Sequence, residues 1–275
     1  MPAGDAFETA LVRTLGSYPL ALFFALLPVL LLGAGLLWWA GRRYTVPRET
    51  SPLPPGRYLL IRLAAGFAIL VGAAAGFAEI AIELADGRRV GQLDQIFSDA
   101  VRQNSSDLTR QVFGWLTHFG DTVTLTALGV GVALLLLARG RRWLALGWSL
   151  ALAGNAVLNV TLKALFARAR PVHDEALVVA QGFSFPSGHS SGSVVAYGML
   201  AYVLIRTLSP AQASRAGLPL VLAATALAFS VGCSRIFIQV HFATDVLAGF
   251  ASGITWLAIC IGSIELTRHY RRQAG

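Results

Sequence analysis

Long apolar runs separated by short polar segments dominate the pattern of hydrophobic and polar positions along this chain of 275 residues. Several runs reach the roughly 20 residues that an α-helix needs to cross the hydrocarbon layer of a bilayer. The pattern therefore predicts an all-α fold, a polytopic membrane helical bundle with about seven transmembrane helices. The expected spans are residues 18–40, 58–84, 121–138, 143–166, 187–205, 218–235 and 242–264.

Two segments outside these spans show helical periodicity with a polar face. In residues 1–16, Phe7, Leu11 and Leu15 recur at helical spacing, which favours a helix at the membrane interface. Residues 85–120 form the longest polar stretch, and its apolar positions also repeat with a helical period. We expect one or two surface helices there and not a separate domain.

Composition supports a membrane protein. Hydrophobic residues make up 55% of the chain and charged residues 13%, about half the charge of a soluble domain. The net charge is +8, but the basic residues lie between the apolar runs and form no stripe, so we expect no nucleic-acid partner. Cys233 and Cys260 are expected near opposite membrane faces, as free thiols in core positions.

The distribution of arginine predicts the orientation of the spans. One set of connections, with the C-terminal tail, is much richer in arginine than the other, and arginine-rich connections stay on the cytoplasmic side. We therefore expect the N-terminus outside and the C-terminus inside. The residues of the rich set are Arg42, Arg43, Arg48, Arg57, Arg139, Arg141, Arg142, Arg206, Arg215, Arg268, Arg271 and Arg272.

The first candidate for chemistry is the segment 185–190, Phe-Pro-Ser-Gly-His-Ser, which opens an apolar run. Ser187 can cap a helix and Gly188 allows close approach of a ligand to the backbone. The N–H groups and positive dipole at such a helix start suit a phosphate, and His189 in the first turn can transfer a proton. Pro-Ser-Gly is also ordinary turn chemistry, so a simple helix cap is the alternative.

Cations form the second candidate. Lys163 is the only lysine in the chain and lies inside an expected span, where a charge is costly and usually functional. Arg168 and Arg170 follow it. Lys163 and Arg170 are seven residues apart, so on a continuous helix they share a face and can converge on one anion. Extension of the side chain to the interface is the alternative, which suits Arg168 better than Lys163.

The third candidate is Arg235, which follows Ser234, together with His241 and Asp245. His241 and Asp245 are four residues apart and share a helix face. A carboxylate there can hold one imidazole N–H and leave the other nitrogen free as a nucleophile. A structural His–Asp hydrogen bond at a helix start is the alternative.

Topology brings the three candidates together, because each lies at the end of a span on the outer side. Two histidines, an aspartate, three cations and a helix N-terminus at one membrane face suit phosphoryl transfer without a metal. Such transfer depends mainly on positioning and charge stabilisation, which cations and backbone N–H groups can supply. We expect no cofactor.

These residues resemble the three-part signature of the type 2 phosphatidic acid phosphatase (PAP2) superfamily. The matching segments are Lys163-x6-Arg170-Pro171, Pro186-Ser187-Gly188-His189 and Ser234-Arg235-x5-His241-x3-Asp245. The resemblance covers about residues 120–265. It implies a division into N-terminal spans with an interfacial segment (1–120), a PAP2 catalytic helical core (121–265) and a basic cytoplasmic tail (266–275).

The resemblance also implies roles for the site residues. His241 would attack phosphorus and form a phosphohistidine, with Asp245 orienting it, and His189 would protonate the leaving group and later activate water. The remaining positions would hold the phosphate, namely Lys163, Arg170, Ser187, Gly188 and Arg235. No metal is implied. Gln239 stands where many relatives have glycine, and a bulkier residue there is expected to alter the mouth of the pocket.

The function expected from this resemblance is an integral membrane phosphatase acting on a lipid phosphate or diphosphate. Candidate substrates are undecaprenyl diphosphate, phosphatidylglycerophosphate and phosphatidic acid, and the outward-facing site favours the polyprenyl diphosphate. The expected location is the bacterial cytoplasmic membrane, with the site facing the periplasm and an unknown oligomeric state. A lipid phosphotransferase and a non-catalytic lipid-binding or transport protein are the alternatives, although the latter would be expected to have lost a histidine or the aspartate.

Overall fold

The computed structural model describes residues 3–45, 55–86, 88–171 and 182–273. All regular structure in these ranges is helical, which confirms the predicted all-α fold. The N-terminal helices are α1 (Ala3–Ser17), α2 (Pro19–Thr45), α3 (Pro55–Asp86), α4 (Arg88–Gln103) and α5 (Asp107–Leu116). The later elements are the 3-10 helix η1 (Thr117–Gly120), α6 (Thr122–Ala138), α7 (Arg142–Phe166), α8 (Gly188–Thr207), α9 (Pro210–Phe237) and α10 (Ala243–Gln273).

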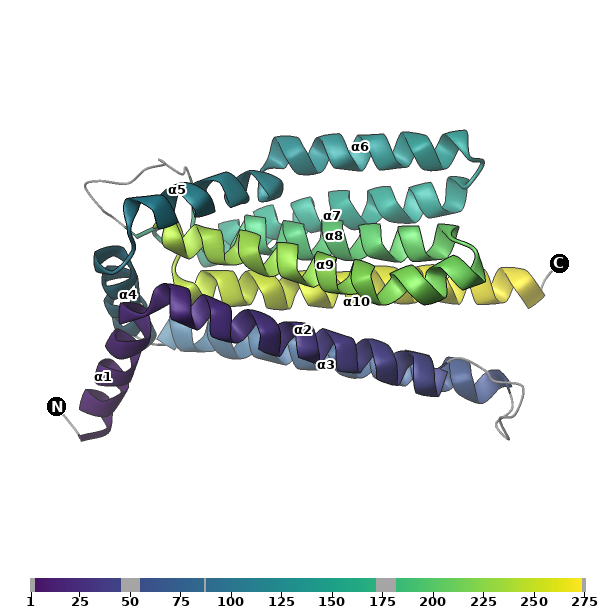
Figure 1. Ribbon diagram of the computed structural model, residues 1–275. Coiled ribbons are helices and arrows are strands. Elements are labelled where there is room, and N and C mark those ends of the chain that lie inside the picture. Colours follow the sequence, from purple (N-terminus) through teal and green to yellow (C-terminus); the bar gives the residue numbers. More distant parts are fainter. Residues whose placement is uncertain (1–2, 46–54, 87, 172–181, 274–275) are drawn as a thin grey trace.

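The long helices run side by side, and the shorter α1 and α4 lie across one end of the bundle (Figure 1). The two termini lie at opposite ends. The end opposite α4 carries the α6–α7 turn, the α8–α9 connection and the end of α10. We call it the arginine-rich end, because Arg139, Arg141, Arg206 and Arg268 lie there.

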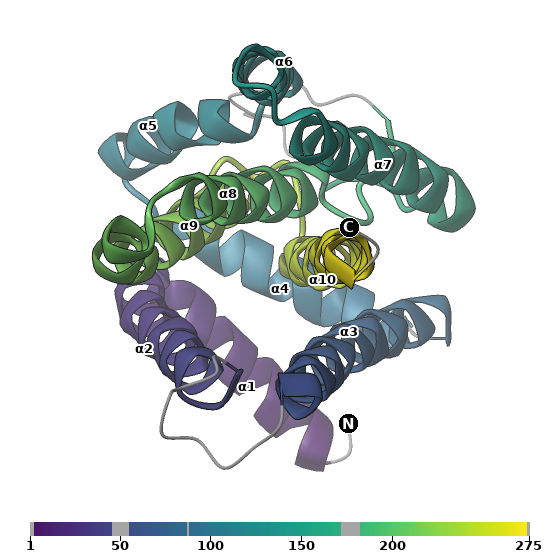
Figure 2. The same ribbon diagram turned by 90° about the vertical axis from the view of Figure 1, so that its right-hand side faces the viewer.

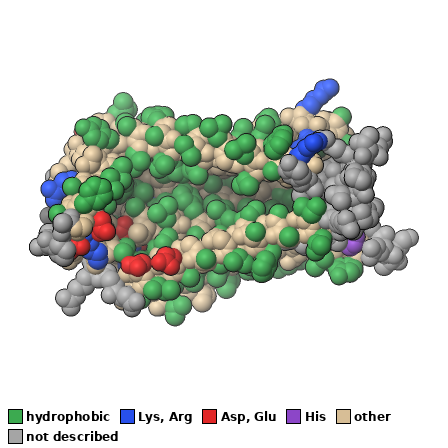
Figure 3. All heavy atoms as spheres, turned by 90° about the horizontal axis from the view of Figure 1, so that it is seen from below, with side chains coloured by type: hydrophobic (Ala, Val, Ile, Leu, Met, Phe, Trp, Pro, Cys, Tyr) green, Lys and Arg blue, Asp and Glu red, His purple; other side chains and the backbone are tan. Residues whose placement is uncertain are grey.

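Six segments of the described chain are long and apolar enough to cross a membrane. They are Pro19–Arg43, Ala64–Ala85, Asp107–Ala138, Arg142–Phe166, Pro210–Phe237 and Ala243–Arg271. The other expected span is α8, which runs along the bundle but whose first turns carry glycine, histidine and serine. Side chains on the face seen in Figure 3 are mostly hydrophobic, and charged groups gather toward its two ends, as a bilayer requires.

Helix α8 is surrounded by protein, which explains its composition. It packs against α7, α9 and α10 (Figure 2), and Ser190, Ser191 and Ser193 are buried within it. Because no lipid faces these positions, small polar residues cost little there and allow close helix packing. Gly249 on α10 shows how close the packing is: a Cβ at this position would lie 2.6 Å from the carbonyl oxygen of Ser187.

The N-terminal helices pack onto the core, with α2 against α9 and α3 against α10. The helix α3 contains Gly72 and Gly76 four residues apart, a spacing that favours close helix packing within a chain or in a dimer. No such packing occurs within the described part of the chain, because no atom there lies within 4 Å of a Cβ built at either glycine. Cys233 and Cys260 are free and partly buried, as expected.

Candidate active site

The start of α8 is built around Ser187 and Gly188. The Ser187 hydroxyl accepts the N–H of Ser190 at 3.4 Å and caps the helix, and the Ser187 N–H donates to the Asp245 carbonyl at 2.9 Å. A Cβ at Gly188 would lie 2.8 Å from Oδ1 of Asn159, so only glycine fits this position without displacing that side chain. The helix N-terminus is thereby fixed against α7 and α10.

His241 lies two residues before α10 and is almost fully buried, with 2% exposure. Its Nδ1 lies 3.3 Å from Oδ2 of Asp245, and its Nε2 lies 3.2 Å from Nη1 of Arg170. An arginine can only donate, so Nε2 is the acceptor and Nδ1 carries the proton that Asp245 accepts. The arrangement leaves the lone pair of Nε2 facing the cation that would hold a substrate.

Burial also keeps His241 neutral. The loss of water around the ring disfavours the imidazolium and lowers the pKa of His241 to about 3, although Asp245 opposes this shift. A neutral imidazole is the form that can attack an electrophile.

Two further predicted cations converge on the same place. Lys163 donates from Nζ to the carbonyl oxygens of Phe183 at 2.6 Å and Ser184 at 3.3 Å. Arg235 is buried and donates from Nη1 to Oγ1 of Thr117 at 2.6 Å. Its Nε is buried and has no hydrogen-bond partner within the described part of the chain, so it is an available donor for an anion.

His189, the second predicted histidine, has a carboxylate partner that the sequence did not indicate. Its Nε2 lies 2.9 Å from Oδ1 of Asp121, the residue between η1 and α6. The other carboxylate oxygen of Asp121 lies 2.7 Å from Nδ1 of His118. Each of the two histidines of the site therefore faces an aspartate.

The expected course of the chain around Arg170 was wrong. We expected Lys163 and Arg170 to share a face of one helix, but α7 ends at Phe166 and Ala167 adopts a left-handed conformation with φ 45°. Arg170 therefore lies beyond the helix, where its Nη1 donates to the Val240 carbonyl at 2.8 Å. The two cations still meet, because the chain turns back toward the start of α10.

The interpretation of Arg168 as an interfacial side chain was also wrong. Its Nη1 donates to Oδ1 of Asp245 at 2.6 Å, and its Nη2 donates to Oδ2 of Asp94 at 2.7 Å. Its guanidinium lies over the ring of Phe242, 4.4 Å from the centroid. Arg168 thus joins the carboxylate behind His241 to a second buried carboxylate on α4.

Asp94 is a residue that we did not predict. Its carboxylate accepts hydrogen bonds from the hydroxyl and the N–H of Thr244 and from Arg168. Burial raises the pKa of Asp94, and the bonds from Thr244 and Arg168 partly offset that shift. A signal existed in the sequence, because Asp94 shares a helix face with Phe97 and Val101 and so places a carboxylate on the apolar side of α4.

Gln239 lies outside the site. Its φ of 61° is in the left-handed region, a backbone conformation that glycine adopts without strain. Its side chain points to α4, accepting from the Ser98 hydroxyl at 2.9 Å and donating to the Ile236 carbonyl at 2.8 Å. It does not line the cavity described next, contrary to the expectation that it would alter the pocket mouth.

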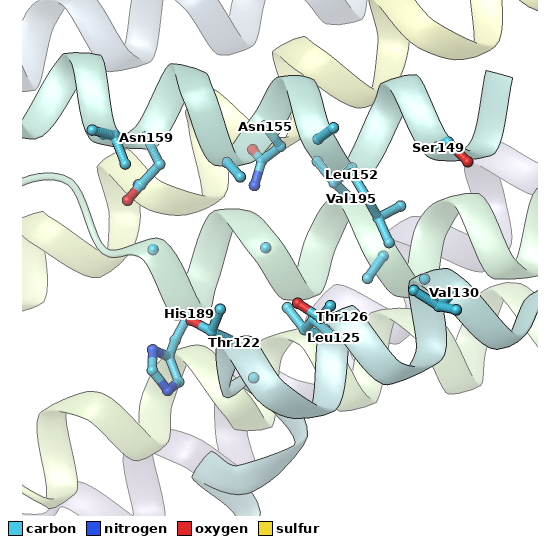
Figure 4. Close-up of a pocket in the computed structure, with 18 of the residues that line it drawn as sticks. Thr122, Leu125, Thr126, Val130, Ser149, Leu152, Asn155, Asn159, His189 and Val195 are labelled. Atoms are coloured by element: carbon cyan, nitrogen blue, oxygen red, sulfur yellow. The ribbon is translucent and has the colours of Figure 1, made fainter. Parts of the chain in front are cut away.

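A cavity of about 810 Å³ extends from this site between α6 and α7. Lys163, Arg170, Gly188, His189, Arg235 and His241 all line it. Ser187 and Asp245 are fully buried and lie behind the lining, so a contact of Ser187 with phosphate stays a prediction. Figure 4 shows His189 and Asn159 at one end, with Leu125, Val130 and Leu152 lining the path away from them. His173, Asp174 and Glu175 follow Arg170 and Pro171 in the sequence, where they would border the pocket or lie in a solvated loop, and they are outside the described residues.

Comparisons with known proteins show what this chain is similar to. The family model described as the PAP2 superfamily matches residues 142–267. Phosphatidylglycerophosphatase B of Bacillus subtilis (strain 168) is 31% identical over 184 residues, which cover 67% of this chain and 89% of that protein.

Two solved structures are similar to this fold. The crystal structure of the first transmembrane PAP2 type phosphatidylglycerolphosphate phosphatase from Bacillus subtilis superimposes with a TM-score of 0.66 and 30% identity, covering 71% of this chain and 96% of that chain. The crystal structure of Aquifex aeolicus LpxE gives a TM-score of 0.44 and 24% identity, covering 58% of this chain and 89% of that chain.

Proposed function

This chain belongs to the PAP2 superfamily and is a membrane phosphatase, and on that premise we propose that it hydrolyses a lipid phosphate or diphosphate through a phosphohistidine at His241. The observation that carries this proposal is the environment of the His241 ring. Asp245 holds the proton on Nδ1, and the lone pair of Nε2 faces Arg170 at the end of a cavity.

In the first step, Nε2 of His241 forms a bond to phosphorus as the bond from phosphorus to the leaving oxygen breaks. His189 donates a proton to that oxygen. The ring of the phosphohistidine carries a positive charge, which the adjacent Asp245 carboxylate offsets. In the second step, His189 takes a proton from water, the oxygen bonds to phosphorus, and the electron pair returns to Nε2.

Cations supply the charge stabilisation in this proposal, so no metal is needed. Lys163, Arg170 and Arg235 line the cavity beside His241, and the N–H groups at the start of α8 face the same region. The unpartnered Nε of Arg235 supports phosphate binding, because a bound oxygen would satisfy a buried donor.

The shape of the cavity supports a lipid substrate. Away from the histidines its lining is mainly apolar, and it lies between α6 and α7, which belong to two of the segments that are long and apolar enough to cross a bilayer. A phosphorylated headgroup could occupy the cationic end while the hydrocarbon chain extends between α6 and α7. The Bacillus subtilis relative supports a bacterial cytoplasmic membrane, and the arginine distribution supports a site at the outer face of that membrane.

The name of the Bacillus subtilis relative supports phosphatidylglycerophosphate as the first substrate to test. Undecaprenyl diphosphate, which the outward-facing site favours, and phosphatidic acid are the other candidates. A phosphate held by cations and attacked by a histidine is common to all three, so the hydrocarbon and the rest of the headgroup must provide the selection.

The test is phosphate release from these three lipids and a short soluble diphosphate by the purified protein, with EDTA present. We expect release from one lipid well above the rest, and about a 10⁴-fold or greater loss in His241→Ala. His269→Ala at the opposite end of the bundle is the matched control and should keep full activity. Loss of wild-type activity in EDTA, or full activity of His241→Ala, would contradict the proposal.

A further inference from the structure

A second cavity of about 730 Å³ lies at the arginine-rich end of the bundle, between α7 and α10. It is separate from the active site, because no described residue lines both cavities. On α7, Trp143, Leu146 and Leu150 line the second cavity, whereas Asn155, Asn159 and Lys163 line the first. No histidine or carboxylate is among the described residues that line the second cavity, so it differs in composition from the active site.

The mouth of this cavity has a large excess of positive charge. Its arginines are Arg141, Arg142, Arg206, Arg268 and Arg271. The carboxylate of Glu265 forms ion pairs with two of them, at 3.5 Å from Arg206 and 3.2 Å from Arg268. Within the described ranges, the other three form no ion pair with an acidic side chain. An anion at this position would meet uncompensated cations.

The rest of the cavity is apolar. Leu146 and Leu150 on α7 face Trp256 and Ile259 on α10 across it, toward the middle of the bundle. At its mouth, the guanidinium of Arg271 lies over the ring of Trp143, 3.7 Å from the centroid, which fixes this cation beside the membrane interface. The cavity therefore combines a cationic mouth with a hydrocarbon-like interior.

We propose that this cavity binds an anionic phospholipid of the surrounding bilayer. The phosphate of the headgroup contacts Arg141, Arg142 and Arg271, and an acyl chain lies between α7 and α10. Arginine suits this task because its planar fork of donors matches phosphate oxygens. A general preference for positive residues on the cytoplasmic side explains arginines in connections, but not their arrangement around an apolar cavity.

The experiment is native mass spectrometry of the full chain in detergent, titrated with phosphatidylglycerol or with phosphatidylcholine of the same acyl chains. We expect the wild type to retain phosphatidylglycerol in preference to phosphatidylcholine. The triple variant R141Q/R142Q/R271Q should bind phosphatidylglycerol at least about tenfold more weakly, because each arginine near a membrane surface contributes measurably to anionic lipid binding.

The matched control is R43Q/R139Q/R215Q, which removes the same charge from exposed arginines that do not line the cavity. It should bind phosphatidylglycerol like the wild type. An equal loss in both triple variants, or equal retention of the two lipids, would overturn the proposal. If R141Q/R142Q/R271Q does not elute as a folded species, the double variant R141Q/R142Q takes its place.

Inorganic phosphate provides a further control. At the concentrations used for the lipid it should not displace bound phosphatidylglycerol, because it lacks the acyl chain that fills the apolar part of the cavity. Displacement by inorganic phosphate alone would show that the cavity is a simple anion site, and would contradict the proposed lipid.

Discussion

The carboxylate of Asp245 is held from three directions. It faces Nδ1 of His241, accepts the N–H of Phe242 at 3.0 Å, and accepts from Arg168 at 2.6 Å. Arg168 in turn reaches Asp94 on α4. A network of charged and hydrogen-bonded groups therefore connects α4, which lies outside the residues matched by the family model, to the ring of His241. We expect this network to position the His241 ring without touching the substrate.

The first residue-scale prediction concerns Asp94→Asn. This change leaves Arg168 with one carboxylate, and the resulting shift of Asp245 should misplace the His241 ring. We expect kcat to fall by about 10- to 100-fold with little change in KM, because small errors in the position of a reacting group are costly. The measurement is steady-state phosphate release with the preferred lipid of the substrate panel.

Asp99→Asn on the same helix is the matched control, since Asp99 accepts from Gln95 and takes no part in the network that reaches Asp245. It should leave kcat unchanged. Arg168→Gln should resemble Asp94→Asn or be more severe. A rise in KM without a fall in kcat, or equal effects of the two aspartate variants, would refute a positioning role for Asp94.

Some contacts of the site residues could be predicted from the sequence, and others could not. His241 and Asp245 share a spacing that defines their pairing locally, and their contact is present. The contacts of Arg168 and Asp94 join residues 74 positions apart, so no local pattern defines them. The pattern predicts Asp121 only as the start of a span, and its contact with His189 joins residues 68 positions apart.

At the scale of elements, the cavity between α6 and α7 is the feature that could hold the hydrocarbon part of a lipid next to the site. The 3-10 helix η1 separates α5 from α6. At its end, the N–H of Asp121 donates to the His118 carbonyl, and the Asp121 side chain faces His189. The helices α6 and α7 then border the cavity along their length (Figure 4). This path could carry the hydrocarbon part of a substrate.

The element-scale prediction is that Ala156→Trp, which fills the cavity from α7, lowers kcat/KM for the lipid by at least about tenfold. Ala156 lines the cavity about two turns from Lys163, so the cationic end stays open. Turnover of a short soluble phosphate ester should remain close to that of the wild type. Measuring both substrates on one preparation separates a blocked chain path from a damaged site.

Ala127→Trp supplies the control, because Ala127 is exposed on α6 and does not line the cavity. Equal losses on both substrates in Ala156→Trp would contradict a role for this cavity in holding the hydrocarbon chain. The same would follow if Ala127→Trp reproduced the selective loss.

Most elements could be predicted from hydrophobic runs, and α4 and α5 from their periodicity, although α5 belongs to the segment Asp107–Ala138 that is long and apolar enough to cross a membrane. The predicted span 143–166 ends where α7 ends, but the turn that follows could not be predicted, because residues 167–170 contain no helix breaker before Pro171 and the turn depends on Ala167 adopting φ 45°. The burial of α8 could not be predicted from a local pattern either, because the helices that surround it are α7, α9 and α10.

At the scale of the whole molecule, charge and hydrophobicity divide the bundle along its length. The candidate active site lies at the end crossed by α1 and α4, and the phospholipid cavity that we propose lies at the arginine-rich end. The arginine count in the sequence predicts which end faces the cytoplasm. Packing within the molecule was less predictable, as the exposed Gly72 and Gly76 show.

The central claim is that His241 carries the phosphoryl group during turnover. Its most direct test is a rapid base quench of the enzyme with lipid labelled in the transferred phosphate, followed by mapping of the labelled peptide. The account predicts a base-stable, acid-labile label on the peptide that contains His241, absent from His241→Ala and present in His269→Ala. Turnover without any such label, or a label that persists in His241→Ala, would contradict it.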